Sequence, residues 1–320
     1  ALKNNTGNNN LAIGYQSLLN NTTGVQNTAI GHESLYSNTT GFNNTAIGYQ
    51  SLYSNTIGNY NTALGTSALS SNTTGWSNTA IGYQALYSNT TGIENTAIGN
   101  AALYANTIGT YNTAIGSQSL LNNTTGKQNT AIGHAALYAN TEGTNNTAIG
   151  ASALFSNTTG SNNTAIGNNA QASSPTASNQ ITLGNSAITS LRCAVTTITA
   201  LSDRRDKTNI EPFAVGLDFI RELKVSSWNY DKRDWYIERD EEGKIISTKK
   251  PDGSKISKEK YHGFIAQDLQ KIQKDFGVDL GLVLEDNPDR LETSEGRLFP
   301  VLVKAVQELA DRLEKLEGVK

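Results

Sequence analysis

A serine and a lysine stand five positions apart in one short charged segment, Ser202-Asp203-Arg204-Arg205-Asp206-Lys207-Thr208-Asn209-Ile210. A serine hydroxyl is a weak nucleophile and needs an adjacent base to take its proton. A lysine can be that base only where burial lowers its pKa well below the ordinary value of about 10.4. Taken alone, the segment predicts no more than a solvated turn, with Ser202 or Asp203 as the N-cap of a helix.

The other residues that commonly carry chemistry are few and scattered. The one cysteine, Cys193, excludes an intrachain disulfide framework and a cysteine-rich zinc site. The histidines are spread along the chain, at His32, His134 and His262. We therefore expect no metal site and no cofactor.

The averages of composition describe neither half of this 320-residue chain, which has 25 Lys+Arg, 28 Asp+Glu and a net charge of -3. Residues 1–201 hold only six charged side chains, and only eight of the 29 glycines lie beyond residue 201. A break this sharp predicts two separately built parts.

A near-neutral first part and a mildly acidic second part argue against nucleic-acid binding. No apolar run reaches about 18 residues, so no membrane span is expected.

The first part is a repeat of 17 residues in unbroken register. Two glycines recur in each of ten copies, from Gly7 and Gly14 to Gly160 and Gly167, and a weaker eleventh copy keeps Gly184. A copy this short cannot hold two helices, whereas glycine turns, β-branched residues and the lack of proline before Pro175 favour a β-solenoid or β-roll. We expect both glycines to mark turns that need positive φ or close backbone approach.

The segment Asn-Thr-Ala-Ile-Gly alternates, so Thr and Ile share one face of a strand and Ala lies on the other. We expect Ile81 and its equivalents to point inward, together with the leucines equivalent to Leu86. Because Ala recurs in all ten copies, from Ala12 to Ala165, we expect the Ala face to pack closely against a neighbouring subunit. Two asparagines per copy are expected to hydrogen-bond along the stack and to satisfy turn backbone groups.

These coils resemble the heads of trimeric bacterial adhesins and the shafts of phage tail fibres, over about residues 4–190. An ice-binding solenoid is a third alternative, but it needs outward threonine pairs, whereas Thr79 shares its parity with the inward-facing Ile. A glycan-degrading spike would need paired carboxylates. The glutamates of the repeat are single and unrelated in position, at Glu33, Glu94 and Glu142.

The strict repeat ends near residue 170, and we expect a transition or neck over 171–201 with strand-like segments at Gln180–Leu183 and Cys193–Leu201. Residues 202–320 are dense in charge and predict a mixed α/β domain. The polar insert Glu238–Lys260, with turns at Glu242-Gly243 and Asp252-Gly253, predicts one or two exposed hairpins.

The C-terminal segment has an a/d heptad spacing of apolar residues. We expect these residues to form the seam of a trimeric coiled coil, and because the segment is short we also expect it to pack on its own domain. The seam residues are Phe299, Leu302, Val306, Leu309, Leu313 and Leu316.

The second part resembles the C-terminal intramolecular chaperone of endosialidase-type phage tail spikes and fibres. Members open with Ser-Asp-x-Arg-x-Lys-x-Asn/Asp-Ile, carry a Gly-Phe/Leu-Ile-Ala-Gln segment and end in a long helix. Here these features are the segment from Ser202, the expected strand Gly263-Phe264-Ile265-Ala266-Gln267 and the stretch from Phe299 to Leu316.

The resemblance implies a chaperone that aligns three chains and then cuts itself off between Leu201 and Ser202. Ser202 would be the nucleophile and Lys207 the base, and His262 would assist or orient. Supporting motif residues would be Asp203, Arg205 and Asn209. Asp206 departs from the family pattern, because a carboxylate beside Lys207 raises the lysine pKa and weakens the base.

The sequence therefore predicts a mainly β protein, in which a trimeric solenoid of ten repeats (1–170) and a neck (171–201) precede an α+β chaperone (202–320). The predicted function is a virion fibre, assembled in the host cytoplasm, with an autocatalytic serine endopeptidase that makes a single self-cut. Expected partners are two further copies, upstream fibre or virion proteins and a host-surface glycan or receptor. The alternative is a bacterial trimeric adhesin head at the cell surface.

Overall fold

The computed structural model describes residues 2–3, 5–188, 190, 208, 210–232, 236–239, 245–285 and 291–318. The chain divides into two compact units, Ala1–Thr196 and Thr197–Lys320. We call the first unit the shaft and describe each unit by itself.

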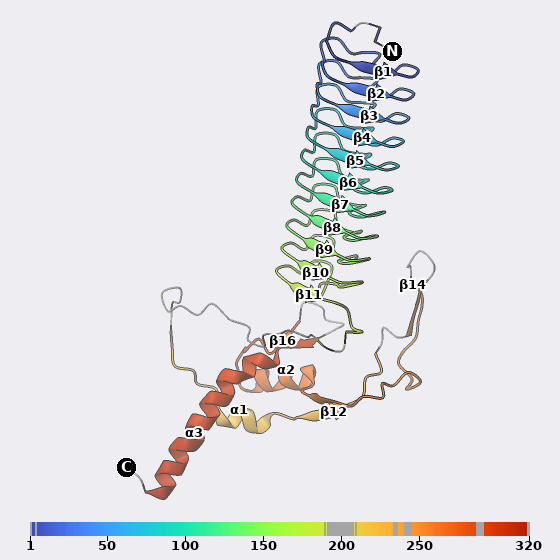
Figure 1. Cartoon of the computed structure of the whole chain (residues 1–320). Coiled ribbons are helices and arrows are strands. Elements are labelled where there is room, and N and C mark those ends of the chain that lie inside the picture. The colour runs from blue at the N-terminus through green and yellow to red at the C-terminus, as the bar shows by residue number, and fades with distance from the viewer. Residues whose placement is uncertain are drawn as a thin grey trace. The chain divides into compact units, whose positions relative to one another are not determined.

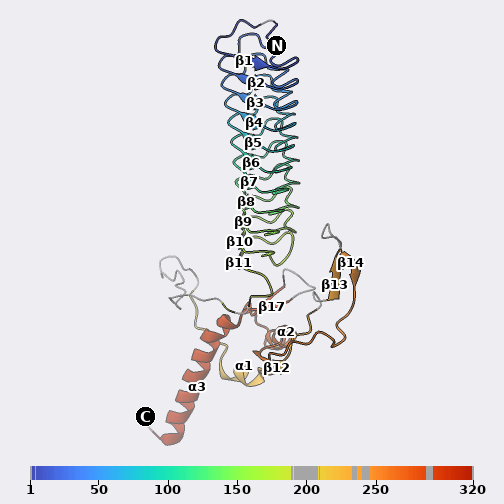
Figure 2. The same cartoon turned by 45° about the vertical axis from the view of Figure 1, so that its right-hand side comes forward.

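The shaft is a stack of coils in which every 17 residues contribute one short strand to a single parallel sheet (Figures 1 and 2). Neighbouring strands pair in register, for example Thr79 with Thr96. The predicted β-solenoid is confirmed. The eleven strands are β1 (Leu11–Ile13), β2 (Thr28–Ile30), β3 (Thr45–Ile47), β4 (Thr62–Leu64), β5 (Thr79–Ile81), β6 (Thr96–Ile98), β7 (Thr113–Ile115), β8 (Thr130–Ile132), β9 (Thr147–Ile149), β10 (Thr164–Ile166) and β11 (Ile181–Leu183).

The predicted inward and outward faces of these strands are reversed. Ala80 and its equivalents in β2–β10 are fully buried inside the coil, whereas Ile13, Leu64 and Ile98 are 54%, 44% and 36% exposed. The Leu86 column is inward as predicted, with 0% exposure. Leucine already fills the narrow interior, which leaves room only for the alanine methyl. The expectation that Ala packs against a neighbouring subunit is therefore wrong, and Thr and Ile form the outer face.

Two buried asparagine ladders run the length of the shaft, as predicted. In one ladder, Asn89 Nδ2 donates to Asn72 Oδ1 at 2.8 Å and to the Gly92 carbonyl at 3.0 Å. In the other, the backbone N–H of Asn95 donates to Asn78 Oδ1 at 3.0 Å. Each buried amide is thereby paired both with the next coil and with a turn carbonyl, so burial leaves it no unmet hydrogen bond.

Both predicted reasons for the glycine ladders are present. Gly82 has φ of +132°, and a Cβ added there would lie 2.5 Å from the Gly99 carbonyl oxygen. At Gly92 an added Cβ would lie 2.5 Å from the Gly109 carbonyl oxygen of the next coil. Any side chain at these positions would force the coils apart.

The second unit is a small α+β arrangement. Its helices are α1 (Leu217–Glu222), α2 (Ala266–Asp275), the 3-10 helix η3 (Glu295–Leu298) and α3 (Phe299–Glu317). Its strands are β12 (Ser226–Trp228), β13 (Ile237–Arg239), β14 (Ile245–Thr248), β15 (Tyr261–Gly263), β16 (Val283–Leu284) and β17 (Glu292–Thr293). They pair as antiparallel two-stranded ribbons, β12 with β15, β13 with β14 and β16 with β17.

The core of this unit gathers around Phe219 from α1, Leu269 from α2, Val301 from α3, and Leu282 directly before β16, all 0% or 1% exposed. The expected strand over 263–267 is wrong, because β15 ends at Gly263 and α2 begins at Ala266. Ala266 and Leu269 lie on the buried face of this helix, so the apolar residues of the segment serve a helix rather than a strand.

The polar insert contains the predicted hairpin, formed by β13 and β14. The predicted turn at Asp252-Gly253 is also present, with Gly253 at φ of +83° and its N–H donating to Asp231 Oδ2 at 2.9 Å. Hydrogen bonds from Ser254 hold the pKa of the Asp252 carboxyl below its usual value. The turn at Glu242-Gly243 and the segment Cys193–Leu201 lie outside the described residues, whereas Ile181–Leu183 forms β11 as expected.

Across the described part of the chain, no helix combines the length and the apolar character needed to cross a membrane.

Candidate functional site

Most of the residues predicted to carry chemistry fall on positions whose geometry the structure does not describe. These are Leu201, Ser202, Asp203, Arg205, Asp206, Lys207 and Asn209. Of the predicted catalytic set, only His262 lies among the described residues.

His262 lies in β15, directly opposite Ser227 of β12. The Ser227 hydroxyl and His262 Nδ1 are 2.6 Å apart and share a hydrogen bond. Side chains of directly paired residues lie on the same face of a ribbon, which brings the two groups together. Because Nδ1 is engaged, Nε2 is the ring nitrogen left for another partner. The sequence does not predict Ser227 as a partner of His262, because no pattern in it pairs two short strands 35 positions apart.

An open groove of about 730 Å³ lies beside this pair. Its lining includes Trp228 and Tyr261 from the β12–β15 ribbon and Gln267 from the start of α2. The Tyr261 hydroxyl donates to Glu259 Oε2 at 2.8 Å, and this bond to a carboxylate raises the tyrosine pKa. The groove is thus lined by aromatic rings, an amide and an imidazole.

The surroundings of Gly263 explain why the Gly-Phe-Ile-Ala-Gln segment begins with glycine. A Cβ added there would lie 2.9 Å from Glu295 Oε1 and 3.2 Å from the Trp228 ring. At the edge of the groove, a side chain at this position would displace the Glu295 carboxylate and crowd the Trp228 ring.

Helix α3 has two apolar stripes, of which one is buried and the other is exposed to solvent. Val301 and Ala305, which are 0% and 3% exposed, face the core of their own unit. The predicted seam is exposed in full. Its residues are Phe299 (69%), Leu302 (47%), Val306 (63%), Leu309 (50%), Leu313 (56%) and Leu316 (84%).

The inner side of α3 is also held by a polar contact. Glu308 Oε2 accepts a hydrogen bond from the backbone N–H of Leu217 at 2.8 Å, at the start of α1. Lys304 Nζ lies 3.6 Å from the same carboxylate. The prediction that this helix also packs on its own domain is confirmed, and that packing leaves the seam in solvent.

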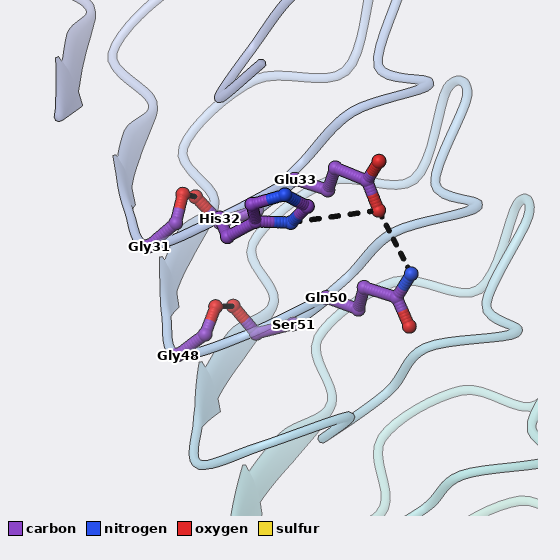
Figure 3. A network of polar contacts seen from close by, with 7 residues as sticks. Gly31, His32, Glu33, Gly48, Gln50 and Ser51 are labelled. Atoms are coloured by element: carbon purple, nitrogen blue, oxygen red, sulfur yellow. Dashed lines mark hydrogen bonds and ion pairs between the residues drawn. The ribbon is translucent and has the colours of Figure 1, made fainter. Parts of the chain in front are cut away.

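A second polar cluster lies on the shaft, at the coils of β2 and β3 (Figure 3). Glu33 Oε2 accepts a hydrogen bond from Gln50 Nε2 at 2.8 Å and lies 3.7 Å from His32 Nδ1. The His32 ring stacks between Tyr15 and Tyr49, with centroids 5.1 and 5.3 Å away. These contacts run from coil to coil and stabilise the stack. No group of three metal-ligating side chains gathers anywhere in the described residues.

Residues 202–278 match the model of a peptidase family described as the chaperone of endosialidase. The matched region contains the segment from Ser202, the Ser227–His262 pair and the start of α2. A β-solenoid with 17-residue coils, followed by an endosialidase-type chaperone region, is the architecture expected from the sequence. The match supports a trimerisation chaperone of the phage tail-fibre type. The comparisons with curated proteins and with solved structures each gave no match.

Proposed function

We propose that this chain is part of a homotrimeric virion fibre whose last domain assembles it and then releases itself. In this proposal residues 1–170 are the ten-repeat part of the shaft, 171–201 the neck that follows it and 202–320 the chaperone. The match of 202–278 to the endosialidase chaperone carries this proposal. Self-association follows as the chaperone's task.

The exposed seam of α3 supports three-chain assembly. Six large apolar side chains at a/d spacing on one helix face, all at least 47% exposed, are costly in a monomer. Covering them with the same stripe of two other chains removes that surface from water. A seam of this length is short for a free coiled coil, and the anchoring of α3 through Val301 and Glu308 holds the helix ready for its partners.

The outer Thr/Ile face supplies the matching surface on the shaft. In a parallel symmetric trimer each residue near the axis meets its own copies, so a charge there would face like charges. The charged residues Glu33, Glu94, Lys127 and Glu142 all lie outside the Thr-Ala-Ile strands. The Thr/Ile face is therefore a face that three identical chains can share without electrostatic cost.

The proposed cleavage balances as an acyl shift followed by hydrolysis. Ser202 Oγ attacks the carbonyl carbon of Leu201, and the neutral Lys207 amine takes the hydroxyl proton. The carbon–nitrogen bond breaks, the Ser202 nitrogen receives that proton, and an ester joins the Leu201 carboxyl to Ser202 Oγ. Water then cleaves the ester, leaving a Leu201 carboxylate and a fragment that begins at Ser202.

Lys207 must be neutral for this step, and Asp206 works against that by favouring the ammonium. Assembly that buries Lys207 would lower its pKa, so the cut would follow trimer formation. In this scheme His262, held through Nδ1 by Ser227, assists or orients the reacting groups. Asp203, Arg205 and Asn209 brace the segment.

The test is a denaturing gel and mass measurement of the native assembly beside Ser202→Ala. We expect the wild type to yield two fragments, the smaller beginning at Ser202, and the variant to remain at 34.2 kDa. Neutral hydroxylamine should trap the ester and give a hydroxamate at Leu201. A wild type that stays intact under assembly conditions would refute self-cleavage, while fragments from the alanine variant would refute Ser202 as nucleophile.

A second candidate is an ice-binding solenoid, because the threonine column lies on the outer face and not in the interior. The same face cannot be buried in a trimer and bind ice. Thermal hysteresis measured on the native assembly distinguishes the two roles, and the fibre proposal predicts none.

A further inference from the structure

Exposed aromatic side chains gather on one corner of the shaft, just before the strands. Tyr60, Trp76 and Tyr111 are 56%, 41% and 50% exposed. Tyr60 and Tyr111 directly precede the buried Asn of their coils, and Trp76 stands one position earlier in its coil. The exposed Glu94 takes the position of the two tyrosines, in the coil between those of Trp76 and Tyr111. We call Tyr60, Trp76, Glu94 and Tyr111 the aromatic stripe.

The fold gives no reason for tyrosine at two of these positions. Tyr60 and Tyr111 have left-handed backbones, with φ of 57° and 59°. Asparagine accepts this conformation more readily than a bulky residue, and it takes the equivalent place at Asn43 and Asn145, with φ of 55° and 57°. Tyrosine here adds backbone strain and exposed apolar surface that asparagine would avoid, which favours a contact outside this unit as its purpose.

A neighbouring column shows what structural aromatics look like in this shaft. Tyr87 stacks on Tyr104 with centroids 5.3 Å apart, and Tyr138 on Phe155 at 4.9 Å, both nearly parallel. The faces of those rings stack on one another between neighbouring coils. In the stripe, only Tyr60 meets another ring within the described residues, in a T-shaped contact with Phe42 at 5.2 Å between centroids. Within the described residues the stripe therefore lacks the face-to-face stacking of the neighbouring column, and its rings stay 41–56% exposed.

Glu94 adds a polar group in the middle of the stripe. Its backbone N–H donates to the Trp76 carbonyl at 3.1 Å, which fixes the two residues beside each other. Within the described residues its carboxylate meets no ion-pair partner, in a unit that has very few charges. An acceptor flanked by aromatic faces is the combination that binds a ligand with apolar faces and hydroxyl or ammonium edges.

The length of the stripe indicates whether its ligand is a small cation or a linear oligosaccharide. Tyr60 and Tyr111 are three coils apart, about 14 Å at the usual strand spacing. A cation–π contact requires the cation within about 6 Å of the ring centroid, so one ammonium group cannot meet both tyrosines. A linear oligosaccharide can, because successive sugar rings stack on successive aromatic faces. The carboxylate disfavours acidic sugars.

We propose that the aromatic stripe is a binding site for a neutral or amino-sugar polysaccharide chain, contacted by Tyr60, Trp76 and Tyr111 through stacking and by Glu94 through hydrogen bonds. The inference rests on the proposed fibre role for its biological meaning. Its geometry depends on neither self-cleavage nor the α3 seam.

The test measures binding of the intact assembly to an array of neutral, amino-sugar and acidic oligosaccharides of four or more units. We expect binding to neutral or amino-sugar chains, and Tyr60→Asn/Tyr111→Asn should weaken it at least about tenfold. Because the shaft itself uses asparagine at this position, the variant should fold. Tyr83→Asn is the matched control, since Tyr83 is 51% exposed outside the stripe and Asn100 takes its place in the next coil.

Three results would overturn the proposal: no binding to any neutral or amino-sugar chain, unchanged binding by the double variant, or binding of choline and lysine peptides instead. A lower melting temperature of the double-variant assembly, without loss of sugar binding, would identify the tyrosines as contacts between copies. Running the array on Ser202→Ala as well separates this question from cleavage, since sugar binding is then read on an uncut chain whose oligomeric state is measured independently.

Discussion

The shaft and the second unit complete their structures in different ways. In the shaft, each coil finds its hydrogen-bond partners in the coil before and after it, and even buried amides such as Asn89 are fully paired. In the second unit, a small core around Phe219 and Leu269 leaves the longest helix with its main apolar stripe in solvent. The hydrogen bonds of the shaft therefore run along its own axis, whereas the second unit presents on α3 a continuous apolar stripe that its own core does not cover.

This difference suits a device that assembles a fibre. A repeat whose contacts are all between neighbouring coils can form without its partners and carries little information about which chains to align. In the proposed assembly the α3 seam supplies that information. Mutations should therefore act on assembly in one unit and on local stability in the other.

The largest effect is expected at the seam. Leu309→Glu places a charge where three copies would meet, so the native mass should fall from trimer to monomer and cleavage should fall with it. Because Leu309 is 50% exposed in the single chain, the substitution should change the folding of the second unit little. Arg312→Glu, on the same helix outside the seam, should assemble normally. A trimeric Leu309→Glu would show that the seam is not the contact.

A smaller but clear effect is expected in the asparagine ladder. Asn89→Ala removes the donor to Asn72, the donor to the Gly92 carbonyl and the acceptor for Asn106, at 2.8, 3.0 and 2.8 Å. Each buried group left unpaired costs about 1–3 kcal/mol. The Gly92 carbonyl keeps the hydrogen bond from Asn78 Nδ2 at 2.8 Å, so the Asn72 oxygen and one N–H of Asn106 are the groups left unpaired. The free energy of unfolding of the shaft, from urea titration, should fall by about 2 kcal/mol or more. The exposed Asn100→Ala should change it by less than about 0.5 kcal/mol, and an equal loss in both variants would contradict the ladder.

The sequence predicts the coils better than it predicts their faces. The 17-residue spacing of glycines and asparagines fixes where each coil turns and which amides stack. Alternation shows only that Ala80 and Ile81 lie on opposite faces, and hydrophobicity then favours the larger side chain for the interior. The structure reverses this because the inward Leu86 column leaves room for nothing larger than alanine.

In the second unit, composition and the heptad spacing predict the helix from Phe299 and its exposed seam. The Ser227–His262 contact could not be predicted, because it depends on the pairing of β12 with β15 across a long insert. The start of α2 at Ala266 was missed because a short apolar run fits a strand as well as a helix.

The smallest effect tests which face of the strand is inside. Ala114→Val adds volume at a position with 0% exposure and should lower the free energy of unfolding by about 1–3 kcal/mol. Thr113→Val, on the outer face of the same strand, should change it by less than about 0.5 kcal/mol. Urea titration monitored by circular dichroism gives both values. A larger loss for Thr113→Val than for Ala114→Val would mean that the faces are the other way round.

The central claim is that three copies of this chain assemble through their second unit before any cut is made. The most direct test is native mass spectrometry of the full-length Ser202→Ala chain, which cannot cut itself in the proposed scheme. We predict a species of three times 34.2 kDa that dissociates when Leu309→Glu is added. A monomer at 34.2 kDa under the same assembly conditions would contradict the account.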